Sequence, residues 1–157
     1  MTARTSAGLL LFRHAEGGLE VLLGHMGGPY FAKKDAGAWT VPKGEYASDE
    51  PAWEAARREF REELGLEPPD GEPIALGEVR QTGGKTVTVW AVEADLDPAA
   101  VEPGTFTMQW PPRSGRTREF PELDRVAWYG LDRAREVIVT AQAAFLDRLA
   151  EHSSPSA

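Results

Sequence analysis

The sequence predicts a single α/β domain, and three observations support this. The chain has 157 residues, which suits one compact domain with a sizeable core. Short apolar runs of strand length alternate with turn residues along most of the chain, and two segments have helical spacing. No repeat or long linker divides the sequence. We therefore expect one domain over residues 1–152 and a frayed tail over residues 153–157.

The first half of the chain predicts a hairpin followed by a loop and a turn. Two apolar runs, residues 6–12 and 19–25, flank a glycine-containing break and are typical of paired strands. Residues 26–39 are glycine-rich and irregular, so we expect a loop there. Pro42 and Gly44 then limit the next segment to a brief strand and a turn.

One amphipathic helix is expected in the middle of the chain. It begins near Pro51, which suits a first helical turn, and Gly65 can end it in the left-handed conformation. At 100° per residue its apolar positions form one stripe that should face the core. The residues of this stripe are Trp53, Ala56, Phe60 and Leu64.

The second half of the chain predicts further strands and a helical end. Residues 74–81 and 85–94 flank a Gly-Gly turn and indicate another hairpin. Residues 105–110 and 126–130 have the composition of strands, and the polar stretch between them, 111–124, is expected to be a loop. From residue 131 to about residue 151 the spacing becomes helical, as one helix or two.

The central helix places three glutamates close together. Glu59 and Glu63 are four residues apart and Glu59 and Glu62 three apart, so their side chains are neighbours on the helix surface. Like charges at this spacing repel each other, and a hard divalent cation such as Mg²⁺ or Mn²⁺ would relieve the repulsion. The alternative is a solvated face on which neighbouring arginines balance the glutamates.

The stretch around this helix resembles the Nudix box, the signature of the Nudix hydrolases. The matching positions are Gly44, Glu50, Arg58, Glu59, Phe60, Glu62, Glu63, Gly65 and Leu66, with the spacing of the family. Phe60 stands where the family more often has an aliphatic residue. Seven fixed residue types would match by chance about once in 10⁸ windows at ordinary residue usage.

The resemblance implies a Nudix-type α/β/α sandwich with a mixed central sheet and a loop-helix-loop metal site. It also implies hydrolysis of a nucleoside diphosphate linked to another group, by attack of water at phosphorus. Glu59, Glu62, Glu63 and the carbonyl of Gly44 correspond to the ligands of Mg²⁺ or Mn²⁺. Arg58 corresponds to the residue that orients the helix and its carboxylates.

The general base is left open by the resemblance. In some family members it is the glutamate that corresponds to Glu59, and in others an acidic residue beyond the box. Glu122 is the first catalytic candidate here because it lies just before a predicted strand, and Glu119 and Asp124 are alternatives. An ordinary surface position remains open for each of these three. Glu50 lies about half a turn around the helix axis from Glu59, so we expect it to bind Arg58 or the loop and not the metal.

Two groups of cationic residues are candidates for binding the substrate's phosphates. Lys34 and Lys43 precede the box, and Arg113, Arg116 and Arg118 lie in the predicted loop beyond it. In a chain of net charge −8 such clusters favour a polyphosphate site, although ordinary surface charge is the alternative.

The substrate class is narrowed only in part. The "PKG" that opens the box resembles that of Nudix hydrolases acting on diadenosine polyphosphates and some nucleoside triphosphates. The proline typical of ADP-ribose hydrolases, and the tyrosine of some dinucleoside polyphosphate hydrolases, are missing beyond the box. We expect a nucleoside triphosphate or dinucleoside polyphosphate. The alternative is a catalytically silent, nucleotide-sensing Nudix module, although no box glutamate is lost.

Composition excludes other classes of partner. The acidic charge argues against nucleic-acid binding, and no apolar run is long enough to span a membrane. No signal peptide is visible, and the chain has no cysteine, which fits a reducing compartment, so we expect a cytoplasmic protein. The sequence does not decide between a monomer and a homodimer.

Overall fold

A mixed sheet forms the centre of the computed structural model, which describes residues 5–81 and 83–153. All but the first residue of the expected frayed tail lies outside the described residues. Within those residues seven strands form the sheet, with β1 in the middle. Both predicted hairpins are confirmed, and the parallel pairing of β1 with β6 makes the sheet mixed. The strands are β1 (Thr5–Ala15), β2 (Gly18–Met26), β3 (Trp39–Thr40), β4 (Lys43–Glu45), β5 (Ile74–Arg80), β6 (Thr86–Glu93) and β9 (Leu123–Gly130).

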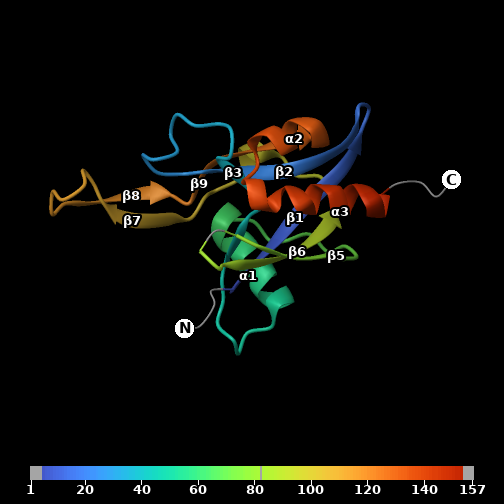
Figure 1. The fold of residues 1–157 in the computed structure, drawn as a ribbon, viewed down its shortest axis with the longest axis horizontal. Helices are drawn as coiled ribbons and strands as arrows, with labels where there is room; N and C mark the ends of the chain where they lie inside the picture. The colour runs from blue at the N-terminus through green and yellow to red at the C-terminus, as the bar shows by residue number, and fades with distance from the viewer. Residues whose placement is uncertain (1–4, 82, 154–157) are drawn as a thin grey trace.

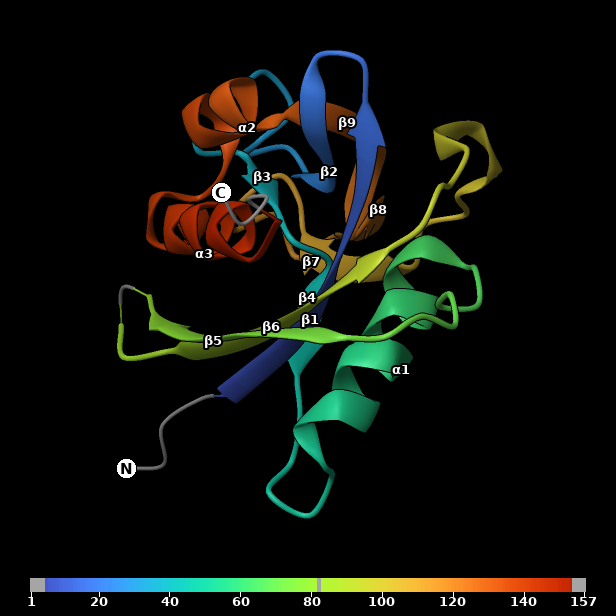
Figure 2. The ribbon, with the colours of Figure 1, turned by 90° about the vertical axis from the view of Figure 1, so that its right-hand side faces the viewer.

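Helices cover both faces of this sheet (Figures 1 and 2). Side chains alternate between the faces of a strand, so Leu9 and Leu11 of β1 point to one layer and Leu10 and Phe12 to the other. Helix α1 (Ala52–Leu64) packs on the first face. The second face is covered by α2 (Leu131–Val137), the short turn η2 (Thr140–Gln142) and α3 (Ala143–Ser153). The predicted α/β/α sandwich is therefore confirmed, with two helices at the C-terminal end.

Helix α1 has the predicted boundaries and the predicted core stripe. Gly65 ends it with φ of 68°, a left-handed conformation that favours glycine. Phe60 and Leu64 are fully buried against β1 and β2, whereas Trp53 is only partly buried and meets Trp90 edge to face. This burial fixes which side of the helix faces the sheet.

One prediction about the loops is wrong. The segment 111–124 is not a loop throughout, because β8 (Thr117–Pro121) pairs with β7 (Thr105–Gln109) in a separate two-stranded sheet. We call residues 105–121 the arm, since this hairpin projects from the body of the molecule (Figure 1). Its strand β8 carries few apolar residues, so only cross-strand pairs such as Phe106 with Phe120 reveal it.

No helix among the described residues could cross a membrane. A short 3₁₀ turn, η1 (Pro98–Ala100), connects β6 to the arm.

Truncating Phe60 tests the packing of α1 on the sheet. Phe60→Ala should lower the free energy of unfolding by about 3–5 kcal/mol, because a fully buried ring leaves a cavity. Urea unfolding measures this loss. Glu54→Ala, at an exposed position of the same helix, should change the free energy by less than about 0.5 kcal/mol. Equal small effects in both variants would contradict the packing described here.

Candidate active site

Gly44 allows the strand before the box to approach the helix closely. It lies in β4, opposite Ala7 of β1. A Cβ atom at Gly44 would overlap the carboxylate of Glu59, so a side chain there would displace that glutamate. The glycine of the box therefore has a steric reason in this chain, because it leaves room for the Glu59 carboxylate beside the backbone.

Arg58 connects the acidic residues of the box. Its Nε and Nη2 atoms donate to the two carboxylate oxygens of Glu50 at 2.8 and 2.9 Å, a bidentate contact. Its Nη1 atom donates to Glu59 at 2.8 Å and to Glu62 at 3.1 Å. The expected contact between Glu50 and Arg58 is confirmed. Arg58 lowers the pKa of Glu50, and Glu50, ahead of the other carboxylates, raises the pKa of Arg58.

Four glutamates line one cavity at the end of α1, which we call the carboxylate cavity. It has a volume of about 360 Å³ and is lined by Glu59, Glu62, Glu63, Gly104, Thr105 and Glu122. The backbone holds Glu122 here, since its N–H donates to Gly104 and its carbonyl accepts from Gly27. A smaller cavity of about 170 Å³ shares Glu63 and Glu122 with the first and is also lined by Lys43.

Burial and mutual repulsion make these carboxylates costly to ionise. Glu63 is 9% exposed, and its Oε2 atom is buried without a hydrogen-bond partner among the described residues. Burial, and then the charges of Glu122 and Glu59, raise its pKa to about 8. Burial also raises the pKa of Glu59 and of Glu122. Lys43 opposes these shifts, but burial lowers its own pKa.

The donor set of the carboxylate cavity fits a divalent cation. A buried carboxylate oxygen without a partner among the described residues, beside three further glutamates, supplies the oxygen ligands that a hard cation requires. Within the described residues no three acidic or histidine side chains are arranged as ready ligands. The reason is visible in the contacts, because Glu59 and Glu62 both turn toward Arg58.

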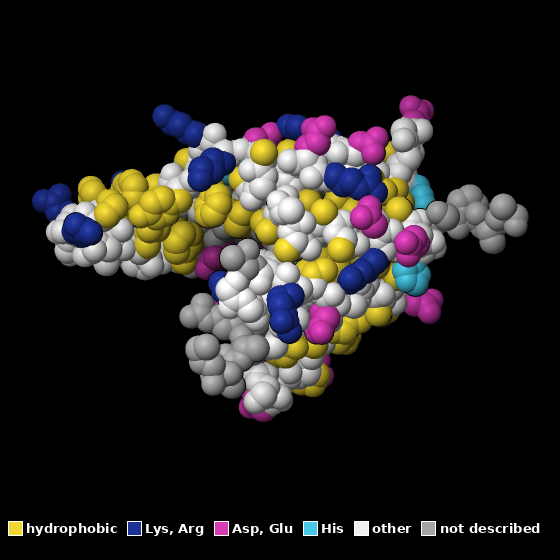
Figure 3. Space-filling view, in the orientation of Figure 1, with side chains coloured by type: hydrophobic (Ala, Val, Ile, Leu, Met, Phe, Trp, Pro, Cys, Tyr) yellow, Lys and Arg dark blue, Asp and Glu magenta, His cyan; other side chains and the backbone are white. Residues whose placement is uncertain are grey.

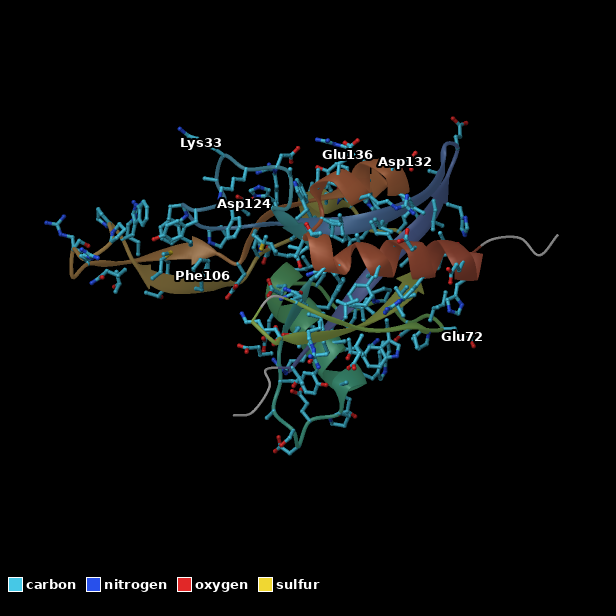
Figure 4. All side chains as sticks on the ribbon, in the orientation of Figure 1. Lys33, Glu72, Phe106, Asp124, Asp132 and Glu136 are labelled. Carbon is cyan, nitrogen blue, oxygen red and sulfur yellow. The ribbon has the colours of Figure 1, made fainter. Side chains whose placement is uncertain are left out.

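The expected base candidates occupy different environments. Glu122 faces the box glutamates in the carboxylate cavity. Glu119 lies on β8 and accepts a hydrogen bond of 2.6 Å from the Thr105 hydroxyl. Asp124 contacts Nδ1 of the buried His25 at 2.9 Å, where β9 begins (Figure 4). Only Glu122 of the three lines either cavity.

The expected cationic residues are brought to the site only in part. Lys43 lines the smaller cavity beside Glu63. Lys34 lies in the exposed loop after β2, where its carbonyl accepts from His25, and the neighbouring Lys33 points outward (Figure 4). The three arginines lie on the arm and line neither cavity: Arg113, Arg116 and Arg118.

Arg118 also points away from the carboxylate cavity. It pairs with Met108, whereas Thr105, three residues earlier on β7, lines the cavity. Because side chains alternate along a strand, Met108 and Arg118 share the face opposite that of Thr105. One chain therefore does not assemble the arginine cluster and the glutamates in a single site.

A glutamine that sequence reasoning missed also lines the smaller cavity. Gln142 is fully buried, accepts from the Val41 N–H at 3.0 Å and donates to the Thr40 hydroxyl at 2.9 Å and to Gln81 at 3.2 Å. It connects η2 to the turn that precedes the box. An amide side chain among the mostly apolar residues 141–146 is the signal that could have identified it.

The family follows from a comparison with family models. The model described as "NUDIX domain" matches residues 2–149, nearly the whole chain. The chain belongs to the Nudix family. This match confirms the predicted family, the predicted fold and the predicted enzyme class, a Nudix pyrophosphohydrolase. Nudix hydrolases generally use divalent metal ions.

Solved structures with the same fold differ widely in sequence. An Ap4A hydrolase from C. elegans superposes with a TM-score of 0.65 at 20% identity, over 96% of this chain and 97% of that one. The NUDIX domain of Shewanella oneidensis NrtR, complexed with ADP ribose, gives 0.63 at 14% identity, over 98% and 90%. The MutT protein from Methanosarcina mazei Go1 gives 0.60 at 20% identity, over 98% and 96%. No curated protein matches the sequence.

The raised pKa of Glu63 predicts how stability changes with pH. Between about 4.5 and about 8 the folded state keeps a proton that the unfolded chain has released, so stability should fall as pH rises. Thermal unfolding of the metal-free Nudix protein across this range measures the slope. The slope of stability against pH should become smaller in Glu63→Gln, and also in the wild type when Mg²⁺ is added. Glu54→Gln should leave this slope unchanged. An unaltered slope in Glu63→Gln would show that this carboxyl is not the cause.

Proposed function

We propose that this Nudix protein hydrolyses a pyrophosphate link in a nucleoside triphosphate or a dinucleoside polyphosphate, using Mg²⁺ or Mn²⁺. The observation that supports this most directly is the unpaired, buried Oε2 of Glu63 in a cavity with three further glutamates. A cavity so rich in negative charge cannot receive a polyphosphate unless cations accompany it. The same cavity is therefore suited to an anion that arrives with a divalent metal.

The box residues would hold the cation. Glu59, Glu62 and Glu63 supply carboxylate oxygens, and the Gly44 carbonyl lies on the strand that faces them. A divalent cation there would neutralise phosphate charge and make water easier to deprotonate. Arg58 would act as a positioning residue, because it holds Glu50, Glu59 and Glu62 in one arrangement.

Glu122 is the general base that the geometry favours. Its carboxylate lines the cavity without a hydrogen bond to Arg58, whereas Glu59 accepts one from that guanidinium. In the proposed step, the water oxygen forms a bond to phosphorus as the bridging P–O bond breaks, and the water proton passes to Glu122. The leaving phosphate keeps the electron pair of the broken bond.

Lys43 is the cation within the chain that is best placed to meet a substrate phosphate. It lines the smaller cavity with Glu63 and Glu122, in the strand directly before Gly44. The shared fold with the C. elegans Ap4A hydrolase is consistent with a dinucleoside polyphosphate as well as a nucleoside triphosphate. The missing ADP-ribose proline argues against ADP-ribose as the preferred substrate.

A product-release assay tests the proposal. The panel contains nucleoside triphosphates, diadenosine polyphosphates, ADP-ribose and nucleotide sugars, each with Mg²⁺ and with Mn²⁺. We expect one of the first two classes to be hydrolysed fastest and chelation to stop the reaction. Nucleotide binding without hydrolysis of any compound would instead support the nucleotide-sensing alternative.

Two substitutions separate metal binding from proton transfer. Glu63→Gln should abolish detectable hydrolysis and weaken Mn²⁺ binding, because it removes a charged ligand while keeping the size of the side chain. Glu122→Gln should lower kcat by about 10²–10⁴-fold with little change in Mn²⁺ binding, because it removes a base. Steady-state rates and Mn²⁺ titration measure both effects, with Glu54→Gln as the exposed control. Wild-type activity in Glu63→Gln would refute the metal assignment.

A further inference from the structure

The arm has one strand edge that is protected by charge and one that is not. Within the described part of the chain, β7 pairs with β8 on one side and with no strand on the other. The outer strand β8 carries Arg118 and Glu119, charges that discourage further pairing. Strand β7 reads Thr-Phe-Thr-Met-Gln and has no charged residue or proline. An exposed, uncharged edge of this kind is a template for another strand.

The arm also has an apolar face that its own chain covers only in part. Phe106, Met108 and Phe120 lie on this face and are only partly buried. Tyr30 packs edge to face on Trp110 but is itself 56% exposed. Figure 3 shows hydrophobic side chains along the arm, and Phe106 is labelled on it in Figure 4. A two-stranded ribbon in water is marginally stable and gains from additional strands.

Strand β7 is complementary to itself. If two copies align antiparallel about a two-fold axis at Thr107, Phe106 faces the partner's Met108 on the apolar face. On the other face Thr105 meets the partner's Gln109, and Thr107 meets the partner's Thr107. At the end of the overlap, Gly104 faces the partner's Trp110, and the Glu62 carbonyl of its own helix lies against this glycine. Every pair is uncharged, and the charged β8 strands remain outermost.

We propose that two copies of this chain pair through their β7 edges, and that the partner's arm tip closes the carboxylate cavity. Gly104 and Thr105 form part of that cavity, so the strand that pairs with them ends beside it. Three residues beyond the partner's Trp110 is the partner's Arg113. This arginine would approach the exposed carboxylates of Glu62 and Glu102 at the foot of the arm. Figure 3 shows acidic and basic side-chain surface next to each other below the foot of the arm.

Charge favours a second copy as the occupant. The arm carries three arginines and one glutamate, whereas the whole chain has a net charge of −8. The arm of one copy is thus attracted to the acidic body of another, and a closed two-fold pair leaves neither β7 edge exposed. The partner's Arg113, which lies on the arm away from its own glutamates, would then meet the phosphates of a substrate bound in this cavity. This last step rests on the proposed function.

The pairing is tested without any activity measurement. Sedimentation velocity should give the mass of a dimer for the wild type. Thr107→Lys alone and Thr107→Glu alone should each be monomeric, because like charges would face each other at the axis. A mixture of these two variants should again form dimers. Thr117→Lys, an equally exposed threonine on β8, should remain dimeric.

Three outcomes would overturn the pairing. A monomeric wild type removes the dimer. A Thr107→Lys protein that stays dimeric places the interface elsewhere. A mixture of the two Thr107 variants that stays monomeric contradicts the register about Thr107.

Complementation between inactive subunits tests the action of Arg113 across the interface. Arg113→Ala should lower kcat/KM by about 10- to 100-fold, because it removes a charge-assisted contact to phosphate. Mixing it with Glu63→Gln should recover activity, since one site of each mixed dimer has intact glutamates and an intact partner Arg113. No recovery in mixed dimers of confirmed mass, or full activity of Arg113→Ala alone, would overturn the contribution of the partner's arginine. An inactive wild-type dimer would overturn the proposed function and leave the pairing in place.

Discussion

The contacts of Arg58 organise the site more than any other interaction. One guanidinium holds Glu50 from the loop before α1 and two glutamates of the helix, and it reaches the Glu45 carbonyl at 3.4 Å. The planar fork of arginine can satisfy several carboxylates at once, which a lysine cannot. Without it, the acidic residues would repel one another at the point where the helix meets β4. The loop, the strand and the helix of the box are therefore oriented by one side chain.

Arg58 cannot neutralise every carboxylate that it helps to gather. Glu63 makes no hydrogen bond to Arg58, lies near the charges of Glu122 and Glu59, and keeps one buried oxygen that has no partner within residues 5–81 and 83–153. An isolated chain designed only for stability would not retain such a group, because a buried polar atom without a hydrogen-bond partner is costly and ionising it costs more. The arrangement becomes favourable once a cation is present. The metal-free site thus lowers the stability of the fold locally, as functional sites that bind charged ligands often do.

The sequence was sufficient to predict the features that local chemistry determines. The C-terminal glycine, the apolar stripe and the glutamate spacing of helix α1 all lie within one short stretch of sequence, so its limits and the Glu50–Arg58 contact could be predicted. Strand β8 could not be predicted from the sequence, because it forms by pairing with β7 and has few apolar residues of its own. Gln142 was missed for a similar reason, since its partners Thr40 and Val41 are a hundred residues away. The path of the chain into β9 likewise decides which acidic residue faces the glutamates of the box, and this path could not be predicted. The three candidates were Glu122, Glu119 and Asp124.

The arginines predicted to bind substrate phosphates line neither cavity of their own chain. Spacing suggested that Arg113, Arg116 and Arg118 would surround the substrate of their own chain, yet the hairpin carries them away from the carboxylate cavity. The uncharged β7 edge beside this cationic tip is a template for pairing with another strand. Strand β7 is complementary to itself, and its foot forms the wall of the cavity. Arg113 can therefore serve a polyphosphate site, provided that the site belongs to the other subunit.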